Sequence, residues 1–414
     1  MNEKLPKGWS AAHLASIALV TSGGTPARSQ AIYWNGDIPW VTTGEVSFNI
    51  ITTTNECITE IGLANSAAKI FPAETLLIAL YGQGKTRGTV AKLGISAATN
   101  QACAAIIFNS QHNQSFYFYY FQNKYNELRE MSNAGSQKNL SLDVLKSLLI
   151  CSPPLAEQQK IACILTSWDA AISCTQRLLE NSKQQKKAMM QQLLTGRRRL
   201  PGFSKNWLKI KLGELFSRVT TRNSEKCTAV VTISAQQGLI RQEDFFSKSV
   251  ASSILDNYFL IKNGEFAYNK SYSKGYPFGA IKRLNKYKRG VVTSLYICFS
   301  LQDPSQGDKD FFEHFFEYGS LNSTLEKIAH EGGRAHGLLN VKPEDFFAIH
   351  MTVPPLDEQK AIAKVLSAAD ALIAQYEAKL AHLQKQKKAL MQQLLTGKIR
   401  VVPDSSGNAS TTPA

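Results

Sequence analysis

The chain of 414 residues lacks several features that would place it in a familiar class. Its seven cysteines are scattered, odd in number and never spaced as C-x-x-C, which is typical neither of a disulfide framework nor of a zinc site. The N-terminal stretch is a poor signal peptide, because His13 and Ser16 interrupt its short apolar run. No run of about 18 consecutive apolar residues is present, so no membrane span is predicted. We therefore expect reduced thiols in a cytoplasmic protein.

Catalytic and cofactor motifs are also missing. Gly84-Lys85-Thr86 looks like the end of a phosphate-binding loop, but Ala79 stands where that loop needs its first glycine. His330 and His336 are six residues apart, whereas a helical metal pair needs the spacing i, i+4. The chain has no G-x-S-x-G, no G-x-G-x-x-G opening a helix after a strand, and no aromatic-flanked N-P-P or D-P-P motif of amino-methyltransferases. These absences predict a non-catalytic protein without a metal or cofactor of its own.

Acidic residues are fewer than basic ones, with 32 Asp and Glu against 47 Lys and Arg. The formal net charge is +15 and the sequence pI is about 9.4. Such a balance favours a polyanionic partner, either nucleic acid or an anionic membrane. Since no membrane segment is predicted, double-stranded DNA or another nucleic acid is the favoured partner.

Two segments of the chain repeat each other. Residues 153–196 begin PPLAEQQKIACILTSWDAAI and end QKKAMMQQLLTG, and residues 354–397 begin PPLDEQKAIAKVLSAADALI and end QKKALMQQLLTG. The offset is 201 residues without a gap, and 23 of the 44 aligned positions are identical. The chain is therefore an internal duplication, with a pseudo-twofold architecture as the expected result.

Each copy is predicted to form one long helix. Two prolines precede it, where proline is tolerated, and Gly196 and Gly397 stand at the position of a C-terminal cap. Residues of the predicted seam recur at alternating steps of four and three, the spacing of a coiled coil. They are Ile161, Leu165, Trp168, Ile172, Thr175, Leu179, Ser182, Lys186, Met189 and Leu193 in one copy, and Ile362, Leu366, Ala369, Ile373, Tyr376, Leu380, Leu383, Lys387, Leu390 and Leu394 in the other. We expect the copies to pair as an antiparallel coiled coil of about 58 Å.

Polar residues near the end of both helices are identical, although the middle of each helix has diverged. A solvated helix face is the simple interpretation. Retention in both copies indicates instead that each end meets the same kind of partner, so two like surfaces suggest two copies of one partner. The predicted partner-binding residues are Gln185, Lys187, Gln191, Gln192, Gln386, Lys388, Gln392 and Gln393.

The segments outside the repeat are predicted to be two α+β globules of similar size. Each mixes strand-like runs, such as Thr75–Leu80 and Val291–Phe299, with helices near Phe116–Met131 and Phe311–Ile328. Both open with a similar phrase, LPKGW in one and LPGF in the other. Beyond these phrases the two globules differ strongly, which favours separate recognition roles on one scaffold.

Glycine-rich basic loops in both globules are the candidate DNA contacts. Residues 269–289 contain seven Lys or Arg, four aromatic residues and no acid, and residues 81–88 form a shorter loop at the equivalent place. Such side chains can neutralise phosphates and bond to base edges, although a solvated basic loop would look the same. The predicted DNA contacts are Gln83, Lys85, Arg87, Lys138, Lys270, Tyr272, Lys274, Lys282, Arg283 and Arg334.

Two PPLxEQ…QKKxxMQQLLTG repeats that carry two divergent globules resemble the specificity subunit of type I restriction–modification systems. The resemblance extends to about Val402. Within the first globule, residues 36–41 (GDIPWV), 98–101 (ATNQ) and 135–140 (GSQKNL) are similar to phrases of this family's target-recognition domains. The second globule departs from the last phrase, with residues 331–338 (EGGRAHGL) in its place.

This resemblance implies a fold class and a division of labour. The fold would be α+β, with target-recognition domains at 1–152 and 200–352 and conserved helical spacers at 153–199 and 353–402. The small, polar composition of residues 403–414 predicts a disordered tail. Each domain would read one half of a bipartite, asymmetric DNA site, and the helices would set the gap. Two modification subunits would dock, bringing S-adenosylmethionine and the adenine methylation chemistry. Two restriction subunits, with ATP and Mg²⁺, are optional further partners.

Three alternatives stay open at this point. The same scaffold could serve a related type II system, in which one partner fuses the nuclease and the methyltransferase. A stand-alone DNA-binding regulator would use the helices for self-association. A protein–protein scaffold without nucleic acid is the third alternative, and the basic, aromatic loops argue against it.

Overall fold

The computed structural model describes residues 5–82, 84–131, 140–234, 237–245, 255–273, 275–331 and 339–402. The chain divides into two compact units. Unit 1 comprises residues 1–176 and 379–414, and unit 2 comprises residues 177–378. Both boundaries fall inside the long helices, so each unit contains one globular head and parts of both helices. The five-part division at residues 152, 199, 352 and 402 remains a prediction.

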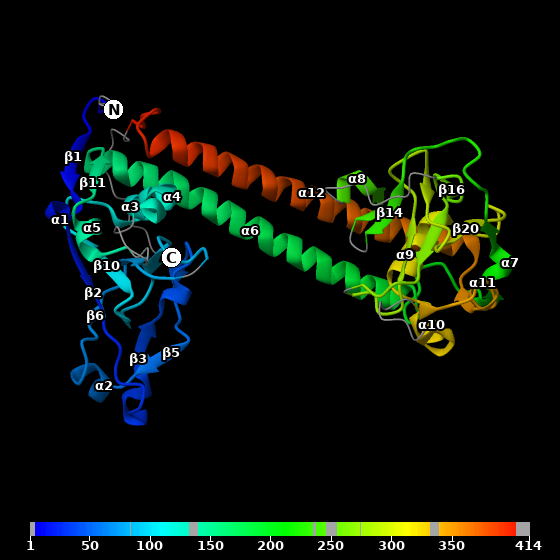
Figure 1. Cartoon of the computed structure of the whole chain (residues 1–414), viewed down its shortest axis with the longest axis horizontal. Helices are drawn as coiled ribbons and strands as arrows, with labels where there is room; N and C mark the ends of the chain where they lie inside the picture. Colours follow the sequence, from blue (N-terminus) through cyan, green and yellow to red (C-terminus); the bar gives the residue numbers. More distant parts are fainter. Residues whose placement is uncertain are drawn as a thin grey trace. The chain divides into compact units, whose positions relative to one another are not determined.

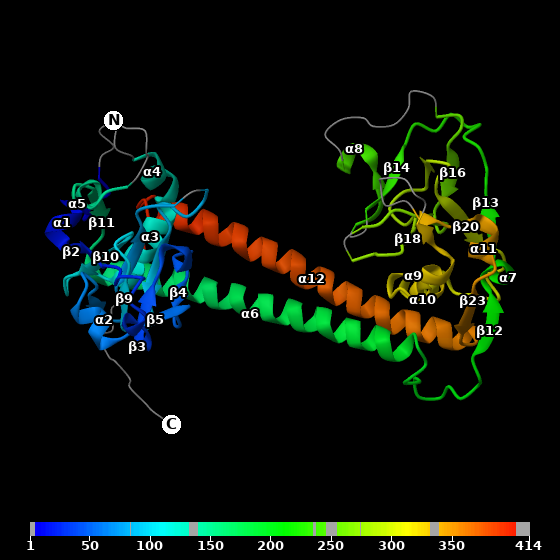
Figure 2. The ribbon, with the colours of Figure 1, turned by 60° about the horizontal axis from the view of Figure 1, so that its bottom comes forward.

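The two long helices confirm the predicted repeat (Figures 1 and 2). Helix α6 spans Leu155–Leu193 and α12 spans Leu356–Leu394, each with 39 residues. Every predicted seam residue is buried or half-buried. Within each unit the two helices pack antiparallel, as predicted. Since the fold combines these helices with two β-rich heads, the α+β class is also confirmed.

Charged pairs join the helices at equivalent positions of the two units. In unit 1, the Lys387 Nζ atom lies 2.5 Å from an oxygen of Asp169. In unit 2, Lys186 makes the same contact with Asp370 at 2.5 Å. Lys186 and Lys387 are seam residues, and a polar residue at a seam position specifies register at some cost in stability. The pairs therefore favour the antiparallel alignment that both units show.

A glycine follows the end of each long helix and packs against a tryptophan of the adjoining head. Gly196 and Gly397 have φ angles of +70° and +71°, a conformation that side chains with a Cβ rarely adopt. A Cβ at Gly397 would lie 2.5 Å from Pro6 and 3.1 Å from Trp9, while Gly196 lies against Trp207. Backbone conformation thus explains the glycine at both positions, and lack of space adds to it at Gly397.

The head of unit 1 is built on two sheets. The five-stranded sheet has the order β2-β10-β7-β8-β4, and the four-stranded sheet has the order β5-β3-β9-β6. Strand β1 pairs with β11 directly before α6. Most neighbours are antiparallel, but β3 with β9 and β4 with β8 are parallel. The strands are β1 (Ser10–His13), β2 (Ala18–Ser22), β3 (Trp34–Val41), β4 (Ile50–Ile51), β5 (Glu56–Ile58), β6 (Ile70–Phe71), β7 (Leu76–Ala79), β8 (Val90–Leu93), β9 (Ala97–Thr99), β10 (Cys103–Phe108) and β11 (Leu149–Ser152).

Short helices cover this head. Helix α3 is rich in aromatic residues, and six of its side chains are buried between the sheet and the long helices. Asn113 caps its N-terminus by accepting a hydrogen bond from the Phe116 amide. The helices are α1 (Leu14–Ile17), η1 (Ala31–Tyr33), η2 (Thr43–Glu45), α2 (Glu60–Ala64), α3 (Gln114–Asn123), α4 (Tyr125–Glu130) and α5 (Leu142–Lys146).

The head of unit 2 contains a four-stranded sheet of order β13-β20-β17-β18 and several two-stranded pairs. Its core is a cluster of phenylalanines contributed by the sheet and by α9. The strands are β12 (Leu208–Lys211), β13 (Phe216–Val219), β14 (Val231–Ser234), β15 (Gly238–Arg241), β16 (Phe259–Lys262), β17 (Phe266–Asn269), β18 (Ala280–Arg283), β19 (Arg289–Val292), β20 (Ile297–Leu301), β21 (His330–Glu331), β22 (Leu339–Asn340) and β23 (His350–Val353). The helices are α7 (Leu212–Leu215), α8 (Gln242–Phe245), α9 (Lys309–Glu317), α10 (Asn322–Ile328) and α11 (Pro343–Phe347).

The two heads share a core topology despite their different sequences. Strands β2-β10-β7-β8 of one head correspond to β13-β20-β17-β18 of the other, and the β1–β11 pair corresponds to β12–β23. Two sequence expectations need correction. The run Val291–Phe299 is not one strand, because β19 ends at Val292 and β20 begins at Ile297. The basic segment 269–289 is not one loop, since it contains the whole of β18.

Candidate nucleic-acid interface

The two loops predicted to contact DNA occupy equivalent positions in the heads. Residues 80–89 connect β7 to β8, and residues 270–279 connect β17 to β18. Both strand pairs lie at corresponding places in the shared sheet. The sequence-based match of these loops is therefore confirmed, and we call them hairpin loop 1 and hairpin loop 2.

The residue that follows a second predicted segment bonds to the base of each hairpin loop. The Leu140 amide donates to the Leu80 carbonyl at 3.1 Å, and the Leu339 amide donates to the Lys270 carbonyl at 3.0 Å. Leu140 follows the segment that holds Lys138, and Leu339 follows the one that holds Arg334. Four predicted contacts, Gln83, Lys138, Lys274 and Arg334, lie outside the described residues. The backbone bonds nevertheless bring the ends of the two candidate segments together in each head.

Hairpin loop 1 has one exposed predicted contact and one that bonds to the rest of the head. Lys85 is exposed, whereas Arg87 is half-buried. The Arg87 Nη2 atom donates to the Arg129 carbonyl at 3.0 Å. Lys85 thus presents its charge to solvent, while Arg87 helps to attach the loop to α4.

Hairpin loop 2 likewise has one exposed and one half-buried predicted contact. Tyr272 is 65% exposed and remains a candidate for contact with sugar, phosphate or a base edge. Lys270 is half-buried, and its Nζ atom donates to the Val341 carbonyl at 3.4 Å. Burial lowers the pKa of Lys270, with a further contribution from nearby Arg218.

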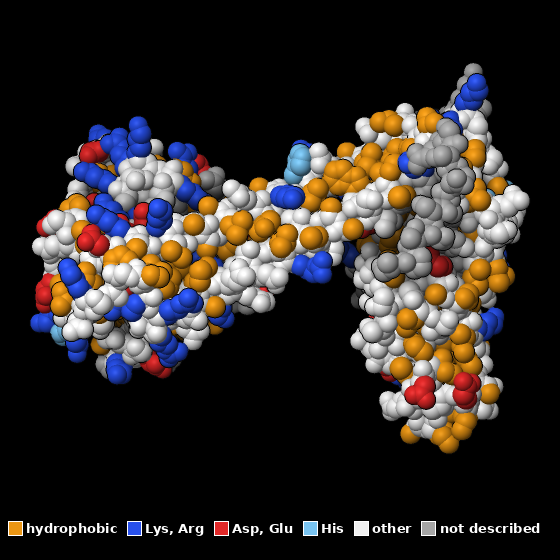
Figure 3. Space-filling model, turned by 180° about the vertical axis from the view of Figure 1, so that it is seen from behind, with side chains coloured by type: hydrophobic (Ala, Val, Ile, Leu, Met, Phe, Trp, Pro, Cys, Tyr) orange, Lys and Arg blue, Asp and Glu red, His pale blue; other side chains and the backbone are white. Residues whose placement is uncertain are grey.

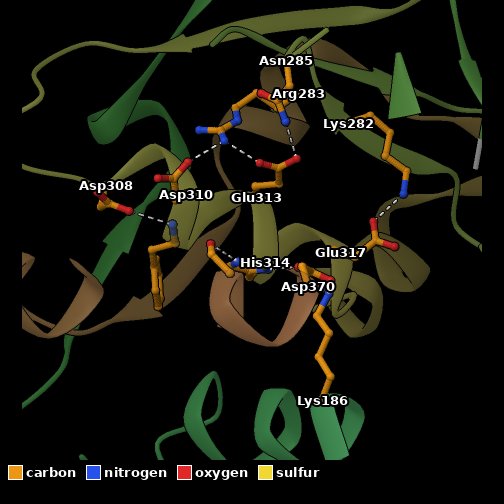
Figure 4. A network of polar contacts seen from close by, with 12 residues as sticks. Lys186, Lys282, Arg283, Asn285, Asp308, Asp310, Glu313, His314, Glu317 and Asp370 are labelled. Atoms are coloured by element: carbon orange, nitrogen blue, oxygen red, sulfur yellow. Dashed lines mark hydrogen bonds and ion pairs between the residues drawn. The ribbon is translucent and has the colours of Figure 1, made fainter. Parts of the chain in front are cut away.

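Lys282 and Arg283 do not lie on an exposed loop, contrary to the interpretation of the sequence. They end strand β18 and turn toward the acidic face of α9 (Figure 4). Lys282 is 8% exposed and forms an ion pair with Glu317. Arg283 lies 2.5 Å from Asp310 and 2.6 Å from Glu313. Their charges are compensated within the head, because the β-sheet core places them against three carboxylates that are distant in sequence.

Two titratable groups of this network, Glu313 and His314, have pKa values shifted by burial. Burial raises the pKa of Glu313, and the charge of Arg283 together with a hydrogen bond from Asn285 opposes that rise. Next to Glu313, the Nε2 atom of His314 and the Ser367 hydroxyl of α12 form a hydrogen bond of 3.0 Å. Burial lowers the pKa of His314, and Lys186 acts in the same direction. The network joins the sheet of this head to both long helices.

Sequence reasoning missed the residues that shape hairpin loop 1. Tyr125 donates a hydrogen bond to the Lys85 carbonyl, and Phe48 packs edge-on against the Tyr125 ring. Lys85 and Tyr125 are 40 positions apart in the sequence, and Phe48 and Tyr125 are 77 apart, so no local pattern connects them. Only Phe48 carries an unusual local feature, a φ angle of +61°, which the sequence does not reveal.

The predicted partner-binding residues of the helices are all exposed. They lie next to seam residues Lys186 and Lys387, which turn inward and pair with aspartates. The identical QKK stretches of the repeat therefore divide between two roles. Their middle lysine joins the helices, and the flanking glutamine and lysine face solvent. Partner contact by these flanking residues stays a prediction.

Basic side chains gather on one face of the unit 2 head. Seen from behind, the head of unit 2 presents many Lys and Arg side chains (Figure 3). Within the described ranges, no group of three or more His, Cys, Asp or Glu side chains could hold a metal ion. Among those same residues, no helix combines the length and apolar character needed to cross a bilayer.

Comparisons with known proteins identify a family model and relatives that are similar to this chain. A family model for the type I restriction modification DNA specificity domain matches residues 6–183. The type I restriction enzyme MjaIX specificity subunit of Methanocaldococcus jannaschii is 30% identical over 190 residues, covering 44% of this chain and 41% of that protein. The MjaX specificity subunit of the same organism is 29% identical over 303 residues, covering 65% and 63%. The chain thus matches less than two thirds of the length of either relative.

A solved structure supports the fold over the full chain. The S subunit of the type I restriction–modification system from M. genitalium superposes with a TM-score of 0.57 at 14% identity, covering 95% of this chain and 97% of that one. At this identity the likeness concerns the fold alone. Together with the sequence matches, it agrees with the duplicated helices and the paired β-rich heads described above. Over residues 6–183 the chain thus matches the type I restriction modification DNA specificity domain, and the relatives that it resembles are specificity subunits of type I restriction enzymes.

Proposed function

We propose that this protein recognises a bipartite, asymmetric DNA site, with one half read by each head. Its long helices dock two methyltransferase subunits, and two restriction subunits are optional further partners. S-adenosylmethionine belongs to the methyltransferase subunits, and ATP with Mg²⁺ belongs to the restriction subunits. The complex acts in the cytoplasm, where the host DNA lies.

The observation that carries this proposal is the contrast between constant and divergent parts of the duplication. The helices repeat the charged pairs, and the exposed glutamine and lysine that flank each paired lysine, at an offset of 201 residues. The heads keep the same four-strand core but place different residues in their hairpin loops. Equal docking surfaces fit two copies of one partner. Unlike hairpin loops fit two different DNA half-sites.

The proposal is tested by co-expressing the chain with a candidate methyltransferase gene from its genomic neighbourhood and sequencing the DNA for methyladenine. We expect methylation at one split, gapped motif that disappears when this chain is deleted. A complex that produces no methylation, or a partner that fuses nuclease and methyltransferase, would contradict the proposed assembly. The absence of any complex would favour a stand-alone DNA-binding protein.

Lys85→Ala tests the contribution of hairpin loop 1. Lys85 is exposed, and each phosphate contact contributes about 0.9 to the slope of log affinity against log salt concentration. We expect weaker binding to all sequences and a slope reduced in magnitude by about 1. The measurement is fluorescence anisotropy of the complex on duplex DNA at several salt concentrations.

Lys146→Ala is the matched control for Lys85→Ala. Lys146 is also on the surface of the first head, pairs with Asp143 at 3.6 Å and lies beside Phe108, at the end of β10 opposite hairpin loop 1. It should leave the salt dependence unchanged. Equal slopes for wild type and Lys85→Ala would remove Lys85 from the interface.

A further inference from the structure

Hairpin loop 1 is attached to helix α4 by a tyrosine. The Tyr125 hydroxyl donates to the Lys85 carbonyl at 2.6 Å and accepts from the Arg129 Nη1 atom, also at 2.6 Å. Arg87 completes the attachment through its bond to the Arg129 carbonyl. Phe48 packs edge-on against Tyr125 with ring centroids 5.1 Å apart. A loop carbonyl, two arginines and two aromatic rings thus form one cluster beside exposed Lys85.

The backbone of hairpin loop 1 is shaped to meet this cluster. Gly88 has a φ angle of +81°, and a Cβ there would lie 3.3 Å from the Arg129 side chain. Phe48 keeps a φ angle of +61°, and its amide donates to the Val90 carbonyl at 2.8 Å. Left-handed backbone at a bulky residue is costly and is retained where surrounding structure holds it. The cluster therefore orders a glycine-rich loop that would otherwise have much conformational freedom.

Hairpin loop 2 is attached to its own helix by a different tyrosine. The Tyr276 hydroxyl, which belongs to the loop, donates to Glu317 at the end of α9 at 2.5 Å. Lys282 bonds to the same hydroxyl at 3.0 Å and forms the ion pair with Glu317 (Figure 4). In the first head the helix supplies the tyrosine, and in the second head the loop supplies it. The two heads reach the same attachment with unrelated residues.

We propose that Tyr125 and Tyr276 are positioning residues that hold the two hairpin loops in the conformation that reads DNA. Arg87, through the Arg129 carbonyl, and Lys282, through the Tyr276 hydroxyl, help to hold the same loops and are not direct DNA contacts. This inference rests on the proposed function. Ordering a loop before binding removes an entropic cost from the complex, and a loop that is held in place discriminates between bases better than one that can adapt.

The test uses Tyr125→Phe and Tyr276→Phe in the full chain with its methyltransferase subunits. Each substitution removes one hydroxyl and keeps the ring. Binding is measured on three duplexes: the methylated motif found by sequencing, and the motif with either half scrambled. We expect each variant to lose about fivefold in discrimination at one half, as for the loss of one hydrogen bond. The two variants should affect different halves, and the salt dependence should stay the same because no charge is removed.

Tyr119→Phe is the control. Tyr119 lies on α3 of the first head, and its hydroxyl donates to Asp169 of α6 at 2.8 Å, so it bonds to a long helix and not to hairpin loop 1. Its loss should leave discrimination at both halves unchanged. Amide hydrogen exchange gives a second readout without DNA. Residues 84–89 should exchange several-fold faster in Tyr125→Phe and not in Tyr119→Phe.

The outcomes separate the two proposals. A wild-type complex that does not discriminate at either half refutes the proposed function and this inference with it. Full discrimination by both tyrosine variants, or loss at both halves in each of them, overturns the positioning role alone. Selective loss at different halves supports it, because a general loss of stability would not distinguish between half-sites.

Discussion

Inserting one heptad into each long helix is expected to lengthen the preferred gap between the two DNA half-sites by about three base pairs. Seven helical residues add about 10 Å, and base pairs are spaced at about 3.4 Å. The insertions are placed after Gln176 in α6 and after Ala378 in α12, where the compact units meet along the chain. The Lys387–Asp169 and Lys186–Asp370 pairs each lie within one unit and remain intact. Methylation of a library with randomised gap lengths measures the result.

A single insertion in α12 alone is the control for this experiment. It changes the length of one helix and not of the other, so the seams no longer match and we expect loss of methylation at every gap. If the double insertion methylated the same gap as the wild type, the helices would not set the spacing. A seven-residue insertion that restores the 3.5-residue repeat should not otherwise disturb the seam.

Arg400→Ala is expected to lower the stability of unit 1 by about 2 kcal/mol at neutral pH. Glu157, at the start of α6, has a side chain only 4% exposed and accepts two hydrogen bonds from Arg400, at 2.8 and 2.7 Å. Removing Arg400 leaves a buried carboxylate without its cationic partner. The effect is smaller than for a fully buried pair, since Arg400 is 39% exposed. Hydrogen exchange in β1 and β11 measures the stability of unit 1 separately.

The pH dependence of this effect has a definite sign. The hydrogen bonds from Arg400 hold the pKa of Glu157 below its usual value. The pair therefore contributes stability above the unfolded pKa of about 4.3 and loses it as the pH falls through the lower, folded value. The difference between wild type and Arg400→Ala should be largest near pH 7 and should shrink below about pH 4.

Two further variants check the cause. Adding Glu157→Gln to Arg400→Ala should recover part of the lost stability, because a neutral amide is less costly to bury than a carboxylate. Lys398→Ala removes an exposed charge from the same segment and should have little effect. An Arg400→Ala protein as stable as the wild type at pH 7 would contradict the role of the pair. Arg199 makes the equivalent bonds to Glu358 in unit 2, at 2.5 and 2.6 Å.

Helix length and seam were predictable because they depend on local periodicity. The spacing of Ile161, Leu165 and their successors indicates one face of one helix, whatever else the chain does. The copy at an offset of 201 residues also predicted the pairing partner, since an apolar stripe must be covered. Glycines 196 and 397 marked the helix ends for a similarly local reason, namely their positive φ angles.

The candidate site was only partly predictable. Glycine and lysine content located hairpin loops 1 and 2, but it could not distinguish exposed Lys85 from compensated Lys282. Lys282 pairs with Glu317, 35 positions further along the chain. Tyr125 reaches hairpin loop 1 across 40 positions.

The sequence by itself determined that two helices repeat, how long they are, which residues line their seam and which loops carry basic residues. These properties follow from neighbours within a few residues of one another. The tertiary structure decided which basic residues face solvent and which are paired with α9, and that a tyrosine attaches each hairpin loop to a helix. Such pairings depend on how strands bring distant residues together, and a long-range ion pair or hydrogen bond leaves no periodic pattern in the sequence.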